Sequence, residues 1–496
     1  MKNRIIALVL ALVITTSVFT VQGSAFLKGD MNGNGVLEIS DAIEVLKIAS
    51  DQVEGGLQAI FLADMDLDFK ITINDARSIL LQSVDLSDIT EYHNQLTPYT
   101  DHGFGASTFG VVTEYCGETF PSSPVDDKSS PLYSAIPYGT FDIVTSGVIH
   151  DSESEKDFYQ LASGRRIYAN EIYVFNGYNM PDNRIVMKKT VTENSDSTQF
   201  YLALDWRVPF NVTINPQEYV TGYNSRPFNI KDGAFTGSYI DITFNYTPYA
   251  EGDLSFPESE VISHTQWLLN GREATLRVYL RNAGHFFGYT AYYDSNNYLV
   301  ISVKEKMNTL SGKIIEIDPG HGGKEPGAGS GTGVYERDIT YNIATYLKTY
   351  LESAGATVVF SRDNSASVPE IEERRLNTIR NNPDMLVSIH LDSSSSSSAN
   401  GSSVYYYKNY SSPLAFAVSR NLPSALKTDL NYNMTNKGAH FYPFRVTRVE
   451  NCPAILVECG FISNSSDFAI LNSANGQNSI ARGIYNGIVE YCSWYI

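Results

Sequence analysis

The last third of the chain alternates between two kinds of apolar pattern, and this alternation limits the possible folds more than any other feature. An apolar run into a glycine-rich loop, KIIEIDPGHGG, predicts a buried strand, and ERDITYNIATYLKTYLESAG has helical periodicity and ends at Gly355. Further strands are predicted at TVVFSR, MLVSIHLD, VYYYKN and AILVECGF, with helices at IEERRLNTIRNN, PLAFAVSRNLPSALK and SIARGIYNGIVEYC. The pattern predicts an α/β domain over residues 312–496, with a mostly parallel sheet flanked by helices.

Polar residues stand at the carboxyl ends of these predicted strands, where open α/β sheets bind their ligands. His321 follows the first strand, His390 and Glu458 close two others, and Glu336 opens the first helix. Two imidazoles and one carboxylate are the donor set of a catalytic zinc site. A separate carboxylate would then take a proton from water and pass it to a leaving nitrogen. The residues favour a zinc hydrolase, although sequence spacing alone leaves open whether they converge.

The ordered motifs of this region resemble those of the zinc-dependent N-acetylmuramoyl-L-alanine amidases. The matching segments are DPGHGG, GVYERDITYNIATYL, SRD, IEERR, SIHLD and PAILVECGFISN. The resemblance implies that His321, Glu336 and His390 bind zinc and that Glu458 is the catalytic carboxylate. It also implies hydrolysis of the peptidoglycan amide between the lactyl group of N-acetylmuramic acid and L-alanine. Asp392 departs from the pattern, since many relatives carry Asn there.

Four other residues near these motifs are expected to have structural roles. Arg374 should orient its helix through an ion pair, whereas Arg375 should be exposed to solvent. Cys459 should point to the opposite face of its strand from Glu458 and lie in the core, because side chains alternate along a strand. His440, which precedes the last predicted strand, is also interpreted as structural.

Residues 26–88 contain an internal repeat, GDMNGNGVLEISDAIEVLKIAS and ADMDLDFKITINDARSILLQSV, and carry a net charge of −8 from 4 basic and 12 acidic residues. In each copy, oxygen-bearing side chains have the spacing with which a loop wraps calcium. The proposed ligands are Asp30, Asn32, Asn34, Glu38 and Asp41 in the first copy, and Asp64, Asp66, Asp68, Thr72 and Asp75 in the second. Gly35 stands at the sharp turn of the first loop, but Phe69 replaces it in the second, which predicts a strained loop and weaker calcium binding.

Apolar residues recur at helical intervals after each loop, so the repeated unit is a loop followed by a helix. This arrangement resembles a dockerin module. The resemblance implies a small α module with structural calcium that docks to a cohesin domain on a scaffold protein. The alternative is a calcium-stabilised repeat that has no partner.

Residues 105–305 alternate aromatic and β-branched runs with turns, which predicts a mainly β region of unknown function. Near its end, ATLRVYLRNAGHFFGYTAYYDSNNYLVISV is interpreted as a helix ending near Gly288 and then a hairpin. This stretch is similar to the copper-amine-oxidase N-terminal-like repeat of exported bacterial proteins, and the similarity implies no copper here.

Residues 1–25 have the charged, apolar and small-residue order of a signal peptide, so we expect cleavage after Ala25 and a secreted protein of the cell wall or a scaffold. No later stretch is apolar enough to span a membrane. The chain has 36 Lys and Arg against 55 Asp and Glu, a net charge of −19, which argues against nucleic-acid partners. The four cysteines (Cys116, Cys452, Cys459 and Cys492) are too few for a disulfide scaffold and are interpreted as buried thiols.

Two other functions remain open at this stage. One is a zinc endopeptidase of the same fold that cuts within the stem peptide. The other is an inactive surface or scaffold-docking protein that only binds the cell wall, although retention of His321, Glu336, His390 and Glu458 argues against it.

Overall fold

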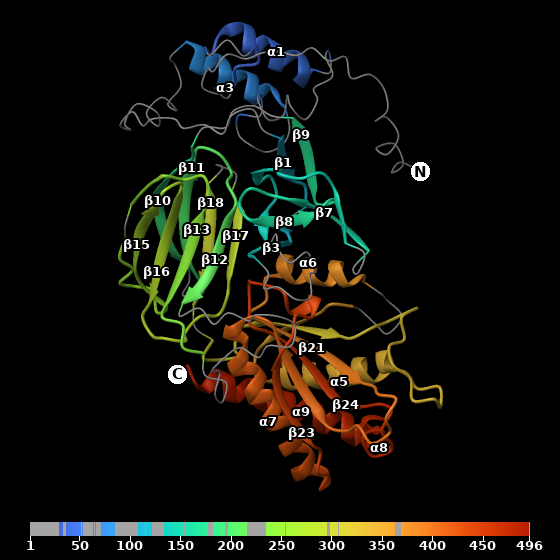
Figure 1. Cartoon of the computed structure of the whole chain (residues 1–496). Helices are drawn as coiled ribbons and strands as arrows, with labels where there is room; N and C mark the ends of the chain where they lie inside the picture. Colours follow the sequence, from blue (N-terminus) through green and yellow to red (C-terminus); the bar gives the residue numbers. More distant parts are fainter. Residues whose placement is uncertain are drawn as a thin grey trace. The chain divides into compact units, whose positions relative to one another are not determined.

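The chain forms two compact units, residues 1–106 with 178–181, and residues 107–177 with 182–496. Each unit is described by itself. The computed structural model (Figure 1) describes residues 29–32, 36–50, 52, 63, 65, 71–84, 108–114, 116–121, 133–151, 155–176, 182–193, 197–215, 235–252, 254–294, 298–305, 307–362 and 369–495. The predicted signal peptide lies outside these residues. None of the helices in this part of the chain is long and apolar enough to cross a membrane.

The first unit contains two helices of equal length, one in each copy of the repeat: α1 (Ile39–Ala49) and α3 (Ile73–Ser83). They pack against each other through Val45 and Ile79, which are fully buried, together with three buried alanines. Helical spacing brings such residues to one face, so each short helix buries its apolar stripe against the other copy. The prediction of a helix after each loop is confirmed.

The second unit begins with short strands in three small sheets, ordered β5-β1-β9, β3-β8-β7-β6 and β2-β4. Phe120, Phe158 and Tyr168 form an aromatic core between strands of this part. The strands are β1 (Thr108–Val112), β2 (Cys116–Gly117), β3 (Thr119–Pro121), β4 (Ile136–Pro137), β5 (Phe141–Ile143), β6 (Ile149–Asp151), β7 (Lys156–Gln160), β8 (Arg165–Tyr168) and β9 (Ile172–Asn176).

Two larger sheets follow, ordered β14-β10-β11-β18-β17 and β12-β13-β16-β15, which confirms a mainly β middle region. Their strands are β10 (Arg184–Glu193), β11 (Ser197–Leu204), β12 (Phe210–Asn215), β13 (Tyr239–Phe244), β14 (Tyr249–Glu251), β15 (Ile262–Asn270), β16 (Glu273–Leu280), β17 (Tyr289–Tyr293) and β18 (Leu299–Lys304). The predicted helix ending near Gly288 is wrong, because its first half is strand β16. Side chains of β16 alternate between buried and half-buried positions, so pairing with β13 and β15 determined its conformation.

The C-terminal part of the second unit has the predicted sheet between helices, in the order β20-β19-β21-β24-β22-β23. Neighbouring strands run parallel except for β22 and β24, which are antiparallel. The strands are β19 (Ile314–Pro319), β20 (Thr357–Phe360), β21 (Met385–Asp392), β22 (Ser402–Tyr406), β23 (Asn436–Phe441) and β24 (Ala454–Phe461). The helices are α5 (Glu336–Ser353), α6 (Ile371–Asn381), α7 (Ser412–Leu430), α8 (Ser465–Leu471) and α9 (Ala474–Ser493), with 3-10 turns η1 (Asn409–Ser411) and η2 (Arg445–Thr447).

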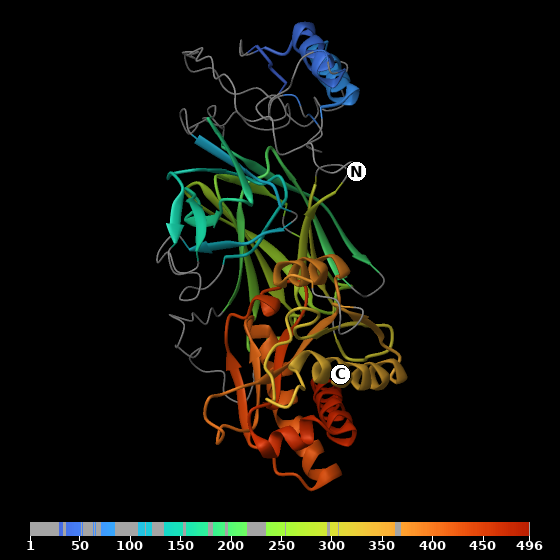
Figure 2. The same ribbon diagram turned by 90° about the vertical axis from the view of Figure 1, so that its right-hand side faces the viewer.

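Successive side chains of β19 point to opposite faces of this sheet. Ile315 and Ile317 are buried on one face, whereas Glu316 bonds Thr378 of α6 and Asp318 bonds Arg374 of α6 on the other. Figures 1 and 2 show α5, α7 and α9 together on the first face and α6 on the second. Strand register places His390 and Glu458 on the face that α6 partly covers.

The middle β region packs closely on the C-terminal part of the same unit. The Tyr289 N–H donates to the Glu450 carbonyl at 2.8 Å. A Cβ on Gly288 would lie 2.7 Å from backbone atoms of the segment before β24, so only glycine allows this approach. The rings of Phe286 and Tyr410, and of Phe287 and Tyr495, meet edge to face with centroids 5.0 and 4.7 Å apart.

Candidate functional site

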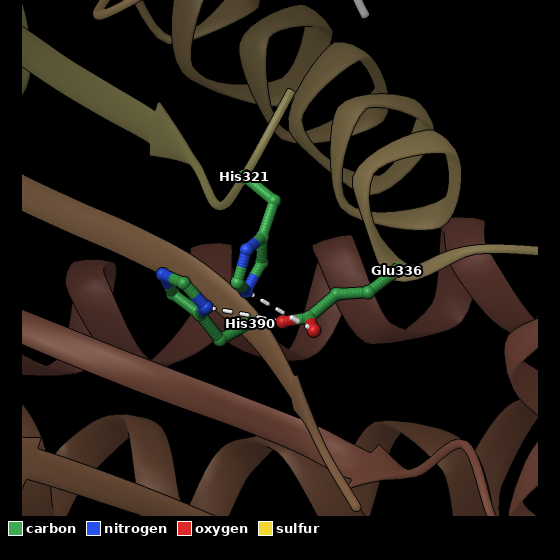
Figure 3. A group of neighbouring side chains, drawn as sticks. All are labelled: His321, Glu336 and His390. Atoms are coloured by element: carbon green, nitrogen blue, oxygen red, sulfur yellow. Dashed lines mark hydrogen bonds and ion pairs between the residues drawn. The ribbon is translucent and has the colours of Figure 1, made fainter. Parts of the chain in front are cut away.

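The three predicted metal ligands converge at the carboxyl ends of β19 and β21 (Figure 3). One ligand atom from each of His321, Glu336 and His390 can be chosen so that all three lie within 4.8 Å of one another. Among the residues that the structure describes, this is the one group of at least three His, Cys, Asp or Glu side chains this close together.

Glu336 occupies the centre of the group and is 3% exposed. Its Oε1 accepts the Leu391 N–H at 2.8 Å and lies 3.0 Å from His390 Nδ1. Its Oε2 accepts the Ala328 N–H at 2.9 Å and lies 3.2 Å from His321 Nε2. Burial by itself raises the pKa of Glu336, but hydrogen bonds and charge from the two histidines outweigh burial and hold this pKa far below its usual value. Glu336 is therefore ionised, as a metal-binding carboxylate has to be.

Two glycines allow the loop after β19 to bring these side chains together. A Cβ on Gly320 would lie 2.4 Å from the His390 ring. A Cβ on Gly327 would lie 2.6 Å from both Glu336 Oε2 and the His321 ring, and its φ of +69° also favours glycine. His321 itself adopts a φ of +59°, which is uncommon for a residue with a side chain.

The backbone of this loop is held by arginines that do not touch the ligand atoms. Arg374 of α6 donates to Asp318 Oδ1 at 2.6 Å, the Pro319 carbonyl at 3.0 Å and the His321 carbonyl at 2.7 Å. Arg362 of the SRD segment, which was not predicted as a site residue, donates to the Pro319 carbonyl at 2.9 Å. The ion pair predicted for Arg374 is confirmed, and it fixes the loop as well as the helix.

The predicted exposure of Arg375 is wrong, since this side chain is 1% exposed and bonds Glu372 Oε1 at 2.8 Å. Glu372 also pairs with Arg445, which in turn pairs with Glu118 of the β region. The helical pattern of α6 alone could not predict that Arg375 is buried, because the charge network around it includes Glu118, more than 200 residues upstream.

Glu458 lies on β24 directly beside His390, its register partner on β21. Its Oε2 is buried and has no hydrogen-bond partner among the described residues. Burial, and then the negative charges of Glu336 and Asp392, raise the pKa of Glu458 well above its usual value. A carboxylate with a raised pKa and an unused oxygen beside a metal triad is suited to accept and return a proton.

The cysteines described in this part of the chain are buried free thiols, as predicted. Cys452, Cys459 and Cys492 form no disulfide. Cys459 is fully buried next to Glu458, consistent with its expected place in the core.

The calcium ligands predicted for the first unit are only partly described. Asn34, Asp64, Asp66 and Asp68 lie outside the described residues. The described ligands are Asp30, Asn32, Glu38, Asp41, Thr72 and Asp75. Asp41 Oδ1 accepts the Met31 N–H at 3.0 Å, and in the second copy Asp75 Oδ1 accepts the Met65 N–H at 2.7 Å.

Comparison with known proteins agrees with the site. Residues 315–490 match the family model described as N-acetylmuramoyl-L-alanine amidase. The chain is 34% identical over 208 residues to the probable cell wall amidase LytH of Staphylococcus saprophyticus, covering 42% of this chain and 67% of that protein. The chain belongs to the N-acetylmuramoyl-L-alanine amidase family. The amidase domain is its C-terminal region, over residues 315–490.

Two further relatives of this amidase illustrate the extent of the match. The N-acetylmuramoyl-L-alanine amidase LytC of Bacillus subtilis is 34% identical over 186 residues, covering 37% of this chain and 36% of LytC. The catalytic domain of the amidase CwlV from Bacillus (Paenibacillus) polymyxa is 31% identical, with a TM-score of 0.34, covering 36% of this chain and 97% of that domain.

Proposed function

We propose that this chain is an exported, zinc-dependent amidase that hydrolyses the amide between the lactyl group of N-acetylmuramic acid and L-alanine. The observation that carries the proposal is the convergence of His321, Glu336 and His390 beside Glu458, whose buried Oε2 has no hydrogen-bond partner in the described part of the chain. The resemblance of residues 315–490 to the family supplies the substrate bond.

The donor set fits zinc, since two imidazole nitrogens and one carboxylate oxygen leave a fourth position for water or substrate. A zinc ion held there would polarise the scissile carbonyl and make bound water more acidic. Leu391 N–H and Ala328 N–H keep the Glu336 carboxylate oriented toward the two histidines. Arg374 keeps the His321 backbone in place through the carbonyl of that residue.

Glu458 performs the proton transfers in this mechanism. Its carboxylate accepts a proton from the attacking water and then donates that proton to the nitrogen of the departing L-alanine. The raised pKa favours this second step, because a protonated carboxyl must be present when the amine leaves. The proton that Glu458 takes from water is the one that the leaving amine receives, and water itself attacks the carbonyl. No covalent intermediate forms, so no serine or cysteine nucleophile is required.

The decisive experiment measures amino groups released from purified peptidoglycan, followed by mass spectrometry of the products. We expect peptides that begin with L-alanine, loss of activity on chelation and recovery with zinc. Other new amino termini would support an endopeptidase instead. Glu458→Gln should retain zinc and wall binding but lose turnover, whereas a wild-type protein that holds zinc and releases no peptide would support the binding-protein alternative.

Export is tested separately, by N-terminal sequencing of protein recovered from the culture medium. The proposal expects the mature chain to begin at Phe26, after cleavage behind Ala25. Retention of residues 1–25 would contradict it.

The repeat in the first unit serves, in this proposal, as a calcium-stabilised module that docks to a cohesin domain. Equivalent backbone hydrogen bonds orient Asp41 and Asp75 in the two copies, which supports a matched pair of loops. Both helices also leave apolar side chains exposed at equivalent positions, with Ile39 and Ile73 more than half exposed.

Calorimetric titration of the intact protein with calcium tests the metal sites. Asp41→Asn and Asp75→Asn should each remove one binding event, and unchanged titrations would contradict the assignment. Replacing Ile39 and Ile73 by Asp should abolish cohesin binding without altering calcium binding. Lys47→Gln, which changes an exposed residue of the same module, provides the control.

A further inference from the structure

Four aromatic side chains lie beyond Glu458 on the face of the sheet that carries the metal triad. The strand order places the metal ligands at β19 and β21, Glu458 on β24, and then β22 and β23. Ser403 of β22 is the register partner of Glu458, and Tyr405, two residues further, therefore points to the same face. Tyr405 is in turn the register partner of His440 on β23. Tyr405 and His440 thus lie on the same face as Glu458, one and two strands beyond it, and level with Leu456, two residues before Glu458 on β24.

The rings of Tyr405, His440, Tyr442 and Phe444 form a continuous group, called here the aromatic patch. Tyr405 is 5.7, 5.9 and 5.2 Å from His440, Tyr442 and Phe444 between ring centroids, and Tyr442 is 4.3 Å from Phe444. All four side chains are half-buried, so each keeps a surface that a ligand can contact. Tyr405 pairs with Leu456, two residues before Glu458 on the neighbouring strand, which places the patch next to the reacting groups.

The position of Glu458 determines which half of the substrate reaches this patch. The scissile carbonyl must lie at the metal triad, and the leaving nitrogen must lie within reach of Glu458. Because Glu458 stands between the triad and β22, the line from carbonyl to nitrogen points toward β22 and β23. The group attached to the nitrogen is the stem peptide, and the glycan remains on the side of the metal ligands.

We propose that the aromatic patch is the subsite that binds the stem peptide, beginning at its L-alanine, during cleavage. This inference rests on the proposed function. Alanine methyl groups and peptide planes pack well on aromatic rings. Lys437 is exposed on β23, and its Nζ lies 4.9 Å from the centre of the ring of Phe461, the register partner of Asp392. Its positive charge suits the free carboxylates of stem peptides, whereas the lactyl carboxyl of the uncleaved glycan is amidated and uncharged.

His440 has a defined orientation in this patch. Its Nε2 lies 2.8 Å from the Lys437 carbonyl, so Nε2 carries a hydrogen and donates to it. The proposal gives His440 a role in binding besides the structural one that the sequence predicts, since the same ring borders Tyr405 on the active-site face.

Kinetics on a soluble muramoyl peptide test the assignment with His440→Ala, Tyr442→Ala and Tyr442→Leu. We expect KM to rise roughly three- to ten-fold in each variant, while kcat stays within about two-fold. Phe441→Leu is the matched control, because Phe441 lies on the same strand but its ring packs with Tyr406 and Tyr407 on the other side. Circular dichroism and zinc content verify that each variant is folded.

Calorimetric binding of the free peptide to zinc-loaded Glu458→Gln protein provides a second readout that does not depend on turnover. Peptide affinity should fall by the same factor when the patch substitutions are added, and affinity for peptide-free glycan should not change. Unchanged KM and peptide affinity, or weaker glycan binding alone, would overturn the assignment. Failure of the wild-type protein to release L-alanine peptides would contradict the proposed function. A peptide affinity that did not change with the patch substitutions would contradict the subsite assignment.

Discussion

Gly320 is needed because the His390 ring occupies the space where a side chain would be. We predict that Gly320→Ala displaces His390 and lowers zinc affinity roughly 10- to 100-fold, with a parallel loss of activity. Zinc content after dialysis against a graded chelator measures the effect. Gly329→Ala is the control, since its Cβ would meet Tyr335 at an ordinary 3.4 Å. Equal zinc retention in the two variants would show that the loop accommodates the added methyl group.

Asp392 influences the proton chemistry through its charge. Its carboxylate helps to raise the pKa of Glu458, so Asp392→Asn should lower that pKa and keep more Glu458 ionised in acid. We expect the acid limb of the pH–activity profile to move to lower pH, by roughly half a pH unit. The profile of kcat/KM measures the shift, and Asp429→Asn on α7 should leave it in place. Movement to higher pH would contradict the assigned sign.

Helix α6 holds the loop that carries the metal triad through Arg374. Arg374→Lys removes the branched group that bonds Asp318, Pro319 and His321 together. We expect about ten-fold weaker zinc binding with the helix content preserved. Arg380→Lys, on the exposed side of the same helix, should bind zinc like wild type. A normal zinc affinity in Arg374→Lys would exclude this role.

The elements that carry the site were predictable because each contains its own pattern. The run before Gly320 and the helical spacing after Glu336 are local signals, and the four candidate site residues stand within the family motifs. Strand β23 and helix α8 were missed, since Asn436–Phe441 is largely polar or exposed and Ser465–Leu471 is short. Strand β16 was read as helix because its partners β13 and β15 lie elsewhere in the sequence. Contacts between distant segments, such as Arg445 with Glu118, have no local signal.

Within the second unit, a buried charge network joins the β region to the amidase domain. Glu118 pairs with Arg445 at 3.0 Å and Arg448 at 3.3 Å. Burial raises the pKa of Glu118, but Arg448, Arg375 and Arg445 outweigh burial and hold it below its usual value. Nearby, Glu171 accepts the Glu118 N–H, and burial, with the charge of Glu118, raises the pKa of Glu171 to about 8.

These two carboxyls should respond oppositely to neutralisation. Glu118 contributes stability above its usual pKa, and this is lost as pH falls through its lower folded value. As pH rises from about 4.5 to about 8, Glu171 lowers the free energy of unfolding, because its carboxyl ionises over this pH range in the unfolded chain but stays protonated in the folded protein. At pH 8 we therefore expect Glu118→Gln to destabilise the unit by roughly 3–5 kcal/mol and Glu171→Gln to stabilise it by on the order of a few kcal/mol. Urea unfolding measures both, and shifts of the same sign would contradict the network.

The edge-to-face contacts of Phe286 with Tyr410 and of Phe287 with Tyr495 bear on how this enzyme could be recombined. A fragment cut at residue 312 would leave Tyr410 and Tyr495, both nearly buried, facing water where the β region had been. The amidase portion is thus not an interchangeable cassette. A fusion of this amidase domain to another protein has to include the preceding sheets, or else replace those two tyrosines with polar residues.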